Sequence, residues 1–202
     1  MPWEKSFDLD DAVDCAIEVF WAKGFEATSM ADLVDRMGIH KGSLYNAFGS
    51  KKELFKRALL KYDQDNRQTT LATLEGVDDA VAAISKLFDA VIAQSTDGSR
   101  EKGCLLVNTA LEHPNHDLDV REIVDTALGD FEAFFKRRIK RGQLRGVIPK
   151  SINANQTAKS LLALVVGLRV LSRGSFGASQ LRAIKNGALR LLTEAVEPTP
   201  KS

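Results

Sequence analysis

Apolar residues recur at helical spacing along almost the whole chain, and no stretch alternates between apolar and polar residues as a strand does. The first apolar stripe runs from Leu9 to Trp21, and Gly24 is placed to end it. Further stripes cover residues 77–94, 104–112, 117–141, 154–173 and 179–196, with breaks between them that contain Gly, Pro, Ser or Asn. The sequence therefore predicts an all-α chain.

Two short helices joined by a glycine turn are predicted directly after the first stripe. Thr28 or Ser29 can cap the earlier helix, and Gly38 ends it. A third helix of about eight residues then turns Leu44 and Phe48 inward. This arrangement is a helix-turn-helix, a motif that places one short helix in the major groove of DNA.

A fourth helix is predicted to close this N-terminal region. Ser50, three residues before Glu53, indicates a capping box, and apolar positions continue to Tyr62. Lys51 lies at the start of this helix, where its ammonium and the free N–H groups of the helix would jointly hold a phosphate. The predicted division is a three-helix helix-turn-helix DNA-binding domain within residues 1–62, a larger helical domain over 63–196 and a frayed tail over 197–202.

The formal net charge of +1 conceals an uneven distribution of charge. Residues 36–61 hold seven Lys and Arg residues against one Glu, a net charge of +6, which predicts a phosphate-facing surface. Residues 63–132 hold fifteen acids against five basic residues, and residues 133–193 hold thirteen basic residues and no acid. We expect these two later segments to face each other in part, with a second nucleic-acid surface as the alternative.

Polar side chains cover the predicted third helix away from its two apolar positions. Lys41 can reach guanine or a phosphate, and Asn46 can bond adenine or a phosphate. Ser43 and Tyr45 carry hydroxyls for phosphate oxygens, while Gly42 has no side chain and lets the backbone come close. These residue types favour a DNA contact, and the alternative is an ordinary solvated surface.

Residues 24–55, GFEATSMADLVDRMGIHKGSLYNAFGSKKELF, resemble the DNA-binding domain of the TetR family of repressors. The resemblance rests on the Gly-Phe pair, the Thr-Ser helix start, the Gly-Ile turn, the Gly-Ser-Leu-Tyr core of the third helix and the opening of the fourth helix. It implies a homodimeric repressor that binds a near-palindromic double-stranded DNA operator and is released by a small-molecule inducer. One departure is Ala47, where many members carry a histidine or aromatic side chain that contacts the sugar-phosphate backbone.

The resemblance also assigns roles to individual residues of the N-terminal region. Thr28 and Ser29 would contact the DNA backbone at the start of the second helix, and Lys51 would hold a phosphate. Phe20 and Leu33 would keep the third helix in place from the core. The predicted DNA-binding residues are Thr28, Ser29, Lys41, Gly42, Ser43, Tyr45, Asn46 and Lys51.

The last two helices are predicted to form the dimer surface. They combine large aliphatic residues with Ala163, Gly167, Gly187 and Ala188, which permit close approach of helices in a four-helix interface. The resemblance implies the same arrangement, because one recognition helix reads too few base pairs and helix-turn-helix proteins commonly bind as dimers. The alternative is that both helices are internal core helices.

The resemblance further places a ligand cavity between the DNA-binding domain and the last two helices. Occupation of this cavity would shift the fourth helix and move the two recognition helices out of register. Each candidate lining residue is equally consistent with ordinary core packing. The candidates are Phe88, Val91, Ile92, Cys104, Leu105, Asn108, Phe131, Phe134, Phe135 and Leu164.

Cys104 supports an alternative form of regulation. It is predicted in the first turn of a helix near Arg100 and Lys102, and both the helix N-terminus and nearby cations favour a thiolate. A repressor that senses electrophiles or oxidants through this thiol is therefore an alternative function. The competing interpretation is a small apolar residue packed under a loop.

Other site classes are weakly indicated or excluded by the residue pattern. Glu112, His113, His116 and Asp117 lack the fixed spacing of strong metal sites, so no metal and no cofactor are predicted. Neither a Ser-His-Asp set, a phosphate loop nor HExxH occurs, so no catalysis is predicted.

A helical protein-interaction module without DNA binding remains an alternative, as does an activator. The longest apolar run, 161–168, is too short to cross a bilayer and the N-terminus is not signal-like, so we expect a cytoplasmic protein.

Overall fold

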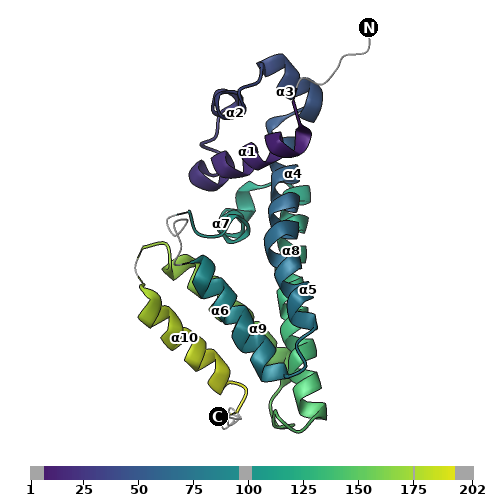
Figure 1. Cartoon of the computed structure of the whole chain (residues 1–202), viewed down its shortest axis with the longest axis vertical. Coiled ribbons are helices and arrows are strands. Elements are labelled where there is room, and N and C mark those ends of the chain that lie inside the picture. Colours follow the sequence, from purple (N-terminus) through teal and green to yellow (C-terminus); the bar gives the residue numbers. More distant parts are fainter. Residues whose placement is uncertain (1–6, 96–101, 175, 194–202) are drawn as a thin grey trace. The chain divides into compact units, whose positions relative to one another are not determined.

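The computed structural model of the chain describes residues 7–95, 102–174 and 176–193. Helices follow one another through these three ranges, and no strand occurs within them, so the predicted all-α fold is confirmed. The same residues contain no helix that is both long and apolar enough to span a membrane. The elements, shown in Figure 1, are α1 (Leu9–Lys23), α2 (Met30–Met37), α3 (Lys41–Phe48), α4 (Lys51–Asp63), η1 (Gln64–Gln68), α5 (Thr69–Glu75), α6 (Ala80–Gln94), α7 (Leu105–Leu111), η3 (His113–Asn115), α8 (Leu118–Leu144), α9 (Ala154–Leu171) and α10 (Ala178–Arg190).

The chain divides into two compact units. The first combines residues 1–67 with 104–125, and the second combines residues 68–103 with 126–202. Helix α7 and the first turns of α8 therefore group with the N-terminal helices, which the sequence pattern did not indicate. The predicted division into functional domains at residue 62 remains a prediction.

Helix α1 forms the base of the first unit. Asp8 caps it by accepting a hydrogen bond from the N–H of Asp10 at 2.7 Å. Gly24 ends it at a φ of 79°, a conformation that is open to glycine, and donates its N–H to the carbonyl of Phe20 at 2.8 Å. Phe20 is fully buried and meets the ring of Phe55 on α4 edge-on, with centroids 4.8 Å apart. The pair joins α1 to α4 at the centre of the unit.

Helices α2 and α3 form the predicted helix-turn-helix. Ser29 caps α2 in a reciprocal capping box with Asp32. Gly38 adopts the left-handed conformation, with φ 65° and ψ 27°, and closes α2 as predicted. The eight-residue helix α3 then turns Leu44 and Phe48 into the core, where both are buried. The apolar positions of α3 therefore fix which of its faces remains exposed.

Helix α4 continues past the point where the first domain was predicted to end. Ser50 caps it as predicted by accepting the N–H of Glu53 at 3.1 Å, but beyond Asp63 the chain passes through the π-helical segment η1 into α5. The guanidinium of Arg67 donates to both carboxylate oxygens of Asp63, at 2.5 and 2.6 Å, and both side chains are buried. A π-helical turn interrupts the 3.6-residue apolar period, which is why the pattern indicated a boundary where the helical path continues.

The second unit is organised around one apolar core. Helix α6 packs against α9 and α10 (Figure 1). Side chains from the later part of α8 fill the same core. Ion pairs surround it, and each joins the acidic segment to the basic one, so the predicted complementarity is confirmed. The pairs are Arg137–Glu75 at 2.7 Å, Arg138–Glu75 at 2.9 Å, Arg141–Asp78 at 2.6 Å, Arg145–Asp78 at 3.5 Å and Lys185–Asp89 at 2.6 Å.

One of these basic residues, Arg138, is buried at 1% exposure. Its guanidinium donates to the carbonyls of Leu74 at 2.5 Å and Val77 at 2.9 Å, where α5 ends. It also lies over the ring of Phe134 at 5.3 Å. Burial lowers the pKa of Arg138, but the carbonyls and the carboxylate of Glu75 supply acceptors for the charge. Arg138 therefore caps α5 from a different helix.

Some helix ends differ from the predicted ones. Helix α8 runs to Leu144 because the side chain of Gln143 donates to the carbonyl of Ile152 at 2.7 Å and ties the following loop to the helix. Helix α10 ends at Arg190 instead of residue 196. The predicted tail at 197–202 and most of the break before Cys104 lie outside the described residues.

Candidate nucleic-acid interface

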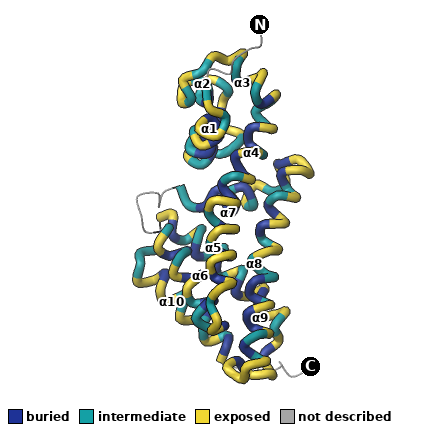
Figure 2. The backbone as a smooth tube through the Cα atoms, turned by 45° about the vertical axis from the view of Figure 1, so that its right-hand side comes forward, coloured by how far each residue is buried: buried dark blue, intermediate teal, exposed yellow. Residues whose placement is uncertain are grey.

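The exposed face of α3 carries the polar residues that the sequence predicted. Lys41, Gly42, Tyr45 and Asn46 are exposed, and Ser43 is half-buried. Figure 2 colours the exposed positions along α3 yellow. Spacing of four residues places Lys41 beside Tyr45 and Gly42 beside Asn46 on adjoining rows of the helix. The structure therefore brings five of the eight predicted DNA-binding residues together on one short helix.

Two features of this face suit the approach of another molecule. The ammonium of Lys41 lies 6.0 Å from the ring centroid of Tyr45, and Lys41 forms no ion pair with any described residue. A Cβ added at Gly42 would meet no described atom within 4 Å, so the backbone there is open to solvent. Ala47 is half-buried and offers only a methyl group at the position where the family often has a larger side chain.

The side chains of Thr28 and Ser29 form hydrogen bonds within the first unit. The hydroxyl of Thr28 donates to the carbonyl of Gly24 at 2.6 Å, and the residue is only 1% exposed. The hydroxyl of Ser29 donates to Asp32 at 2.8 Å and accepts its N–H at 3.1 Å. Asp32 also pairs with Lys23 at 2.5 Å, and this hydrogen bond holds the pKa of Asp32 well below its usual range. Both residues shape the start of α2, and their contact with the DNA backbone stays a prediction.

Lys51 points inward as well. Its ammonium donates to the carbonyls of Phe25 and Thr28, each at 2.9 Å, and lies 4.3 Å from the ring centroid of Phe25. The predicted phosphate-binding ammonium therefore already has partners in the protein.

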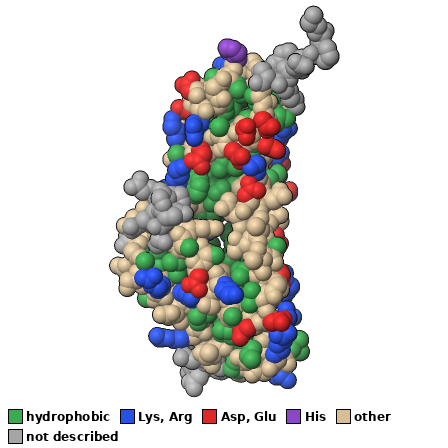
Figure 3. Space-filling view, in the orientation of Figure 1, with side chains coloured by type: hydrophobic (Ala, Val, Ile, Leu, Met, Phe, Trp, Pro, Cys, Tyr) green, Lys and Arg blue, Asp and Glu red, His purple; other side chains and the backbone are tan. Residues whose placement is uncertain are grey.

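Three further lysines of α4 are held by carboxylates of the same unit. Lys52 pairs with Asp117 at 2.7 Å, Lys56 with Asp119 at 3.0 Å, and Lys61 with Asp14 at 2.5 Å. These hydrogen bonds raise the pKa of each of the three lysines. On the face seen in Figure 3, acidic and basic side chains are interspersed over the N-terminal helices.

The basic residues of segment 36–61 therefore divide into two groups. Lys51, Lys52, Lys56 and Lys61 have polar partners, whereas Arg36, Lys41 and Arg57 form no ion pair within the described part of the chain. Arg57 lies over the ring of Phe48 at 5.3 Å. The charge count predicted a net of +6 for this segment, and half of that charge, on Lys52, Lys56 and Lys61, is paired with carboxylates of the first unit.

Both parts of the chain match known proteins. Residues 12–58 match the bacterial regulatory proteins of the tetR family, and residues 80–176 match the tetracyclin repressor-like C-terminal domain. The chain is 30% identical over 159 residues to the uncharacterized HTH-type transcriptional regulator YezE of Bacillus subtilis, which covers 79% of this chain and 80% of that protein. The chain belongs to the TetR family of transcriptional regulators.

Further TetR-family members are similar over nearly the full length. The HTH-type transcriptional repressor ComR of Escherichia coli is 28% identical over 194 residues, which is 96% of this chain and 92% of that protein. The solved structure of a cysteine-substituted CifR, a TetR family regulator in complex with 26-base-pair double-strand operator DNA, has a TM-score of 0.81 and 30% identity and covers 92% of this chain and 96% of that chain. These similarities confirm the family resemblance read from residues 24–55.

In this TetR-family regulator the predicted ligand-lining residues fall into two groups. Phe88, Val91, Ile92, Phe134 and Phe135 are buried in the core of the second unit, with Phe131 and Leu164 packed against it. Cys104, Leu105 and Asn108 belong to the first unit. Their role as a ligand cavity stays a prediction.

Cys104 of the regulator is the N-cap of α7 and not a residue of its first turn. It is buried, with 9% of its surface exposed. Of its predicted cationic neighbours, Arg100 lies outside the described residues. This position agrees better with a small packed residue than with a reactive thiol.

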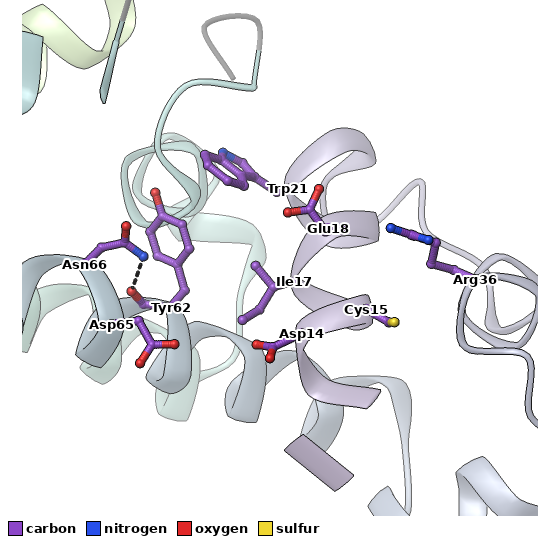
Figure 4. A pocket seen from close by; sticks show the side chains of 9 residues that line it. All are labelled: Asp14, Cys15, Ile17, Glu18, Trp21, Arg36, Tyr62, Asp65 and Asn66. Carbon is purple, nitrogen blue, oxygen red and sulfur yellow. Dashed lines mark hydrogen bonds between the residues drawn. The ribbon is translucent and has the colours of Figure 1, made fainter. Parts of the chain in front are cut away.

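A groove between α1 and the end of α4 was not predicted. It encloses about 350 Å³, and Figure 4 shows Trp21 and Tyr62 side by side in it, with the two rings meeting edge-on at 5.2 Å. Cys15 points to the opposite side of α1 from Tyr62 (Figure 4). Lys61 pairs with both Asp14 and Asp65 of its lining, at 2.5 and 3.1 Å, so the two carboxylates share one ammonium.

The sequence pattern did not indicate that the ring of His116 is buried. The sequence pattern indicates at most a weak metal ligand in a helix break, but the ring of His116 is buried between Phe25 and Phe55, each with centroids 5.7 Å away. Its Nε2 atom has no hydrogen-bond partner among the described residues, and burial lowers its pKa. No group of three or more His, Cys, Asp or Glu within the described ranges could hold a metal ion. No sequence signal separates buried His116 from half-buried His113 in the same break.

Proposed function

We propose that the protein is a ligand-responsive transcriptional repressor that binds a near-palindromic DNA operator as a homodimer and is released by a small-molecule inducer. The observation that carries this proposal is the face of α3, where Lys41, Tyr45 and Asn46 are exposed on a helix whose two apolar residues are fixed in the core. A short helix with this face fits the major groove, which is roughly 12 Å wide. The proposal assigns no catalytic step to the chain.

We divide the DNA contacts into base and backbone contacts. Asn46 lies on the face most distant from the core and would read a base edge, while Lys41 would reach guanine or a phosphate. Ser43 and Tyr45 would donate their hydroxyls to phosphates on either side. Gly42 would let the helix backbone lie close to the DNA, since nothing described occupies the space beside it.

The homodimer would form through α9 and α10. Val170 is 39% exposed, and a Cβ at Gly167 or Gly187 would meet no described atom within 4 Å, so both helices offer open positions for close packing. Ala188, which was predicted to share this role, is fully buried in the core of its own unit and is not available.

Similarity to known regulators supports repression in particular. CifR was solved with operator DNA, and ComR is a transcriptional repressor. For release, the inducer must bind the DNA-incompetent state more tightly, and a coupling of about 1–3 kcal/mol corresponds to roughly 5–150-fold in operator affinity.

Selection of operators from a random DNA pool tests the proposal. We expect enrichment of an inverted repeat whose half-sites are about one helical turn, or a multiple of it, apart. Binding to the enriched site should weaken steeply as salt rises, because the protein releases counterions from phosphates. A variant carrying Lys41→Ala and Asn46→Ala is the control and should enrich nothing. Absence of any enriched repeat with the unsubstituted protein would refute the proposal and favour an interaction module.

A further inference from the structure

The ring of His116 belongs to a cluster of four aromatic rings inside the first unit. It stacks on Phe55 of α4, with the ring planes inclined by 24°, and meets Phe25 of the α1–α2 turn edge-on. Phe25 and Phe55 also contact each other, with centroids 4.9 Å apart, and Phe20 of α1 contacts both. The short segment between η3 and α8 is therefore joined to α4 and to the α1–α2 turn through one imidazole.

The two phenylalanines lie at opposite ends of the helix-turn-helix. Phe25 precedes Ser29, the N-cap of α2, by four residues, and Phe55 lies in the first half of α4, the helix that follows α3. Helix α2 packs against α3. A shift of either phenylalanine would therefore change the orientation of the exposed face of α3 relative to α4.

The cluster accepts the neutral form of His116. Only 2% of its side chain is exposed, and Nε2 has no hydrogen-bond partner among the described residues. The Oε2 atom of Glu112 lies 3.8 Å from Nε2, which is beyond hydrogen-bond distance. Protonation would make both ring nitrogens donors and would place a charge between two apolar rings. Burial lowers the pKa of His116 for this reason.

The charged groups around His116 offer its protonated ring a second position. A pocket of about 230 Å³ lies beside the ring, and the carboxylates of Glu26 and Asp117 belong to its lining. Burial outweighs these two carboxylates and Glu112, although all three favour the charged ring. A protonated ring therefore finds its counterions toward the pocket and not between the phenylalanines. The positive or titrating groups that face the site are Lys52 in the pocket lining, Lys51 at the ring of Phe25, and His113.

We propose that neutral His116 positions the helix-turn-helix for operator binding, and that protonation of its ring weakens operator binding, so that this regulator responds to acid. The inference rests on the proposed DNA binding. A ring that leaves the cluster no longer holds Phe25 against Phe55, and α3 loses its orientation. The coupling is reciprocal, so operator binding must disfavour the protonated ring by the same factor.

The chain has three histidines, which allows each to be removed separately. His116→Phe keeps an aromatic ring in the cluster but removes the titrating group. His113→Gln is the matched control, because His113 lies in the same break and its Nε2 contacts Asp125 at 3.2 Å outside the cluster. Both are made in a His40→Gln background, since His40 lies at the start of α3 and its protonation would strengthen DNA binding directly.

Fluorescence anisotropy with the selected operator measures affinity from about pH 7.5 to about pH 5.5, with circular dichroism to verify the fold at each pH. In the His40→Gln background we expect affinity to fall about tenfold, a size typical of coupling between two sites. The fall should begin below pH 6.5, because the pKa of His116 is lowered from that value. His113→Gln should keep the fall and His116→Phe should abolish it. An equal fall with and without His116→Phe would overturn the inference.

Nuclear magnetic resonance titration of the histidine rings gives a second readout that needs no substitution at His116. We expect the pKa of His116 to be lower in the operator complex than in the free protein. Equal values in the two states would refute the coupling, even if His116→Phe failed to fold. Absence of any selected operator would be a failure of the proposed function, whereas an operator that binds regardless of the protonation of His116 would be a failure of this inference alone.

Discussion

Helix α3 and the first half of α4 both carry lysines, but the lysines of the two helices differ in whether they have partners within the protein. Lys41 on α3 has no ion pair with any described residue, whereas Lys52 and Lys56 on α4 are paired with acidic residues near the start of α8. Lys51 donates to backbone carbonyls. The comparison shows that a count of basic residues over a segment overestimates the charge available to DNA, because it cannot show which charges are already balanced.

The largest expected effect comes from reversing one charge on each helix. Lys41→Glu should weaken operator binding by about 100-fold at low salt, since both protomers lose a phosphate-facing cation and gain repulsion. Lys61→Glu should change operator affinity by less than about threefold, because Lys61 already serves Asp14 and Asp65. Fluorescence anisotropy with a labelled operator measures both.

Thermal unfolding and operator affinity of the two charge-reversed variants together test the distinction between the helices. Lys61→Glu places a third carboxylate beside two others, so its thermal unfolding temperature should fall while that of Lys41→Glu stays close to the original. Equal losses of operator affinity in both variants would show that the two helices contribute alike to the field around DNA, and the distinction between them would be wrong.

A smaller effect should follow from Asn46→Ala. If Asn46 reads adenine, its loss should weaken operator binding by about 10- to 100-fold while random-DNA binding changes less than about twofold. Ser43→Ala is a suitable comparison, since a phosphate contact weakens both DNAs alike. Equal losses on operator and random DNA for Asn46→Ala would reassign it to the backbone.

Gly42→Ala should change the stability of the free protein and its operator affinity in opposite directions. The added methyl meets no described atom within 4 Å, and alanine favours a helix over glycine by roughly 0.5–1 kcal/mol, so the free protein should become more stable. Operator binding should nevertheless weaken by about tenfold if the backbone of α3 lies against DNA. Chemical denaturation and anisotropy together test this, and unchanged operator affinity would place Gly42 outside the contact.

The smallest effect concerns the interior side of α4, where His116 stacks on Phe55. Burial lowers the pKa of His116 below 6.5, so the unfolded chain binds the proton more readily than the folded one. Its contribution to stability is therefore present above pH 6.5 and is lost as pH falls through the lowered pKa. Glu112, Glu26 and Asp117 oppose the shift, and His113 adds to it.

Urea denaturation at a series of pH values measures this contribution. His116→Phe keeps an aromatic ring between the two phenylalanines and should flatten the loss of stability below pH 6.5. His40→Gln, which changes an exposed histidine at the start of α3, should leave the profile unchanged. An identical acid limb in His116→Phe would show that another group is responsible.

Much of the fold followed from local patterns in the sequence. Apolar periodicity placed α1, α2, α3, α6 and α9, and the capping residues Ser29 and Ser50 marked helix starts that the structure confirms. The path from α4 into α5 was not predictable, because a π-helical turn breaks the period on which the prediction relied. The predicted boundary at residue 62 lies directly before this turn.

The candidate site was predictable only in part. The face of α3 could be read from the two apolar positions that anchor it, since a helix has a fixed period. Lys51 and Thr28 could not, because their partners are carbonyls of the turn at Gly24 to Thr28, more than twenty residues away from Lys51 in the sequence. Every residue has a backbone carbonyl, so residue types do not indicate which carbonyl accepts a hydrogen bond.

The burial of Arg138 has a consequence for how the second unit comes apart. Its guanidinium supplies donors to the carbonyls of Leu74 and Val77, so the end of α5 depends on a residue of α8. If either segment opened alone, a buried cation would lose its acceptors and buried carbonyls would lose their donors. The two segments are therefore expected to unfold together, which leaves no low-energy intermediate for a protease to cleave at this point.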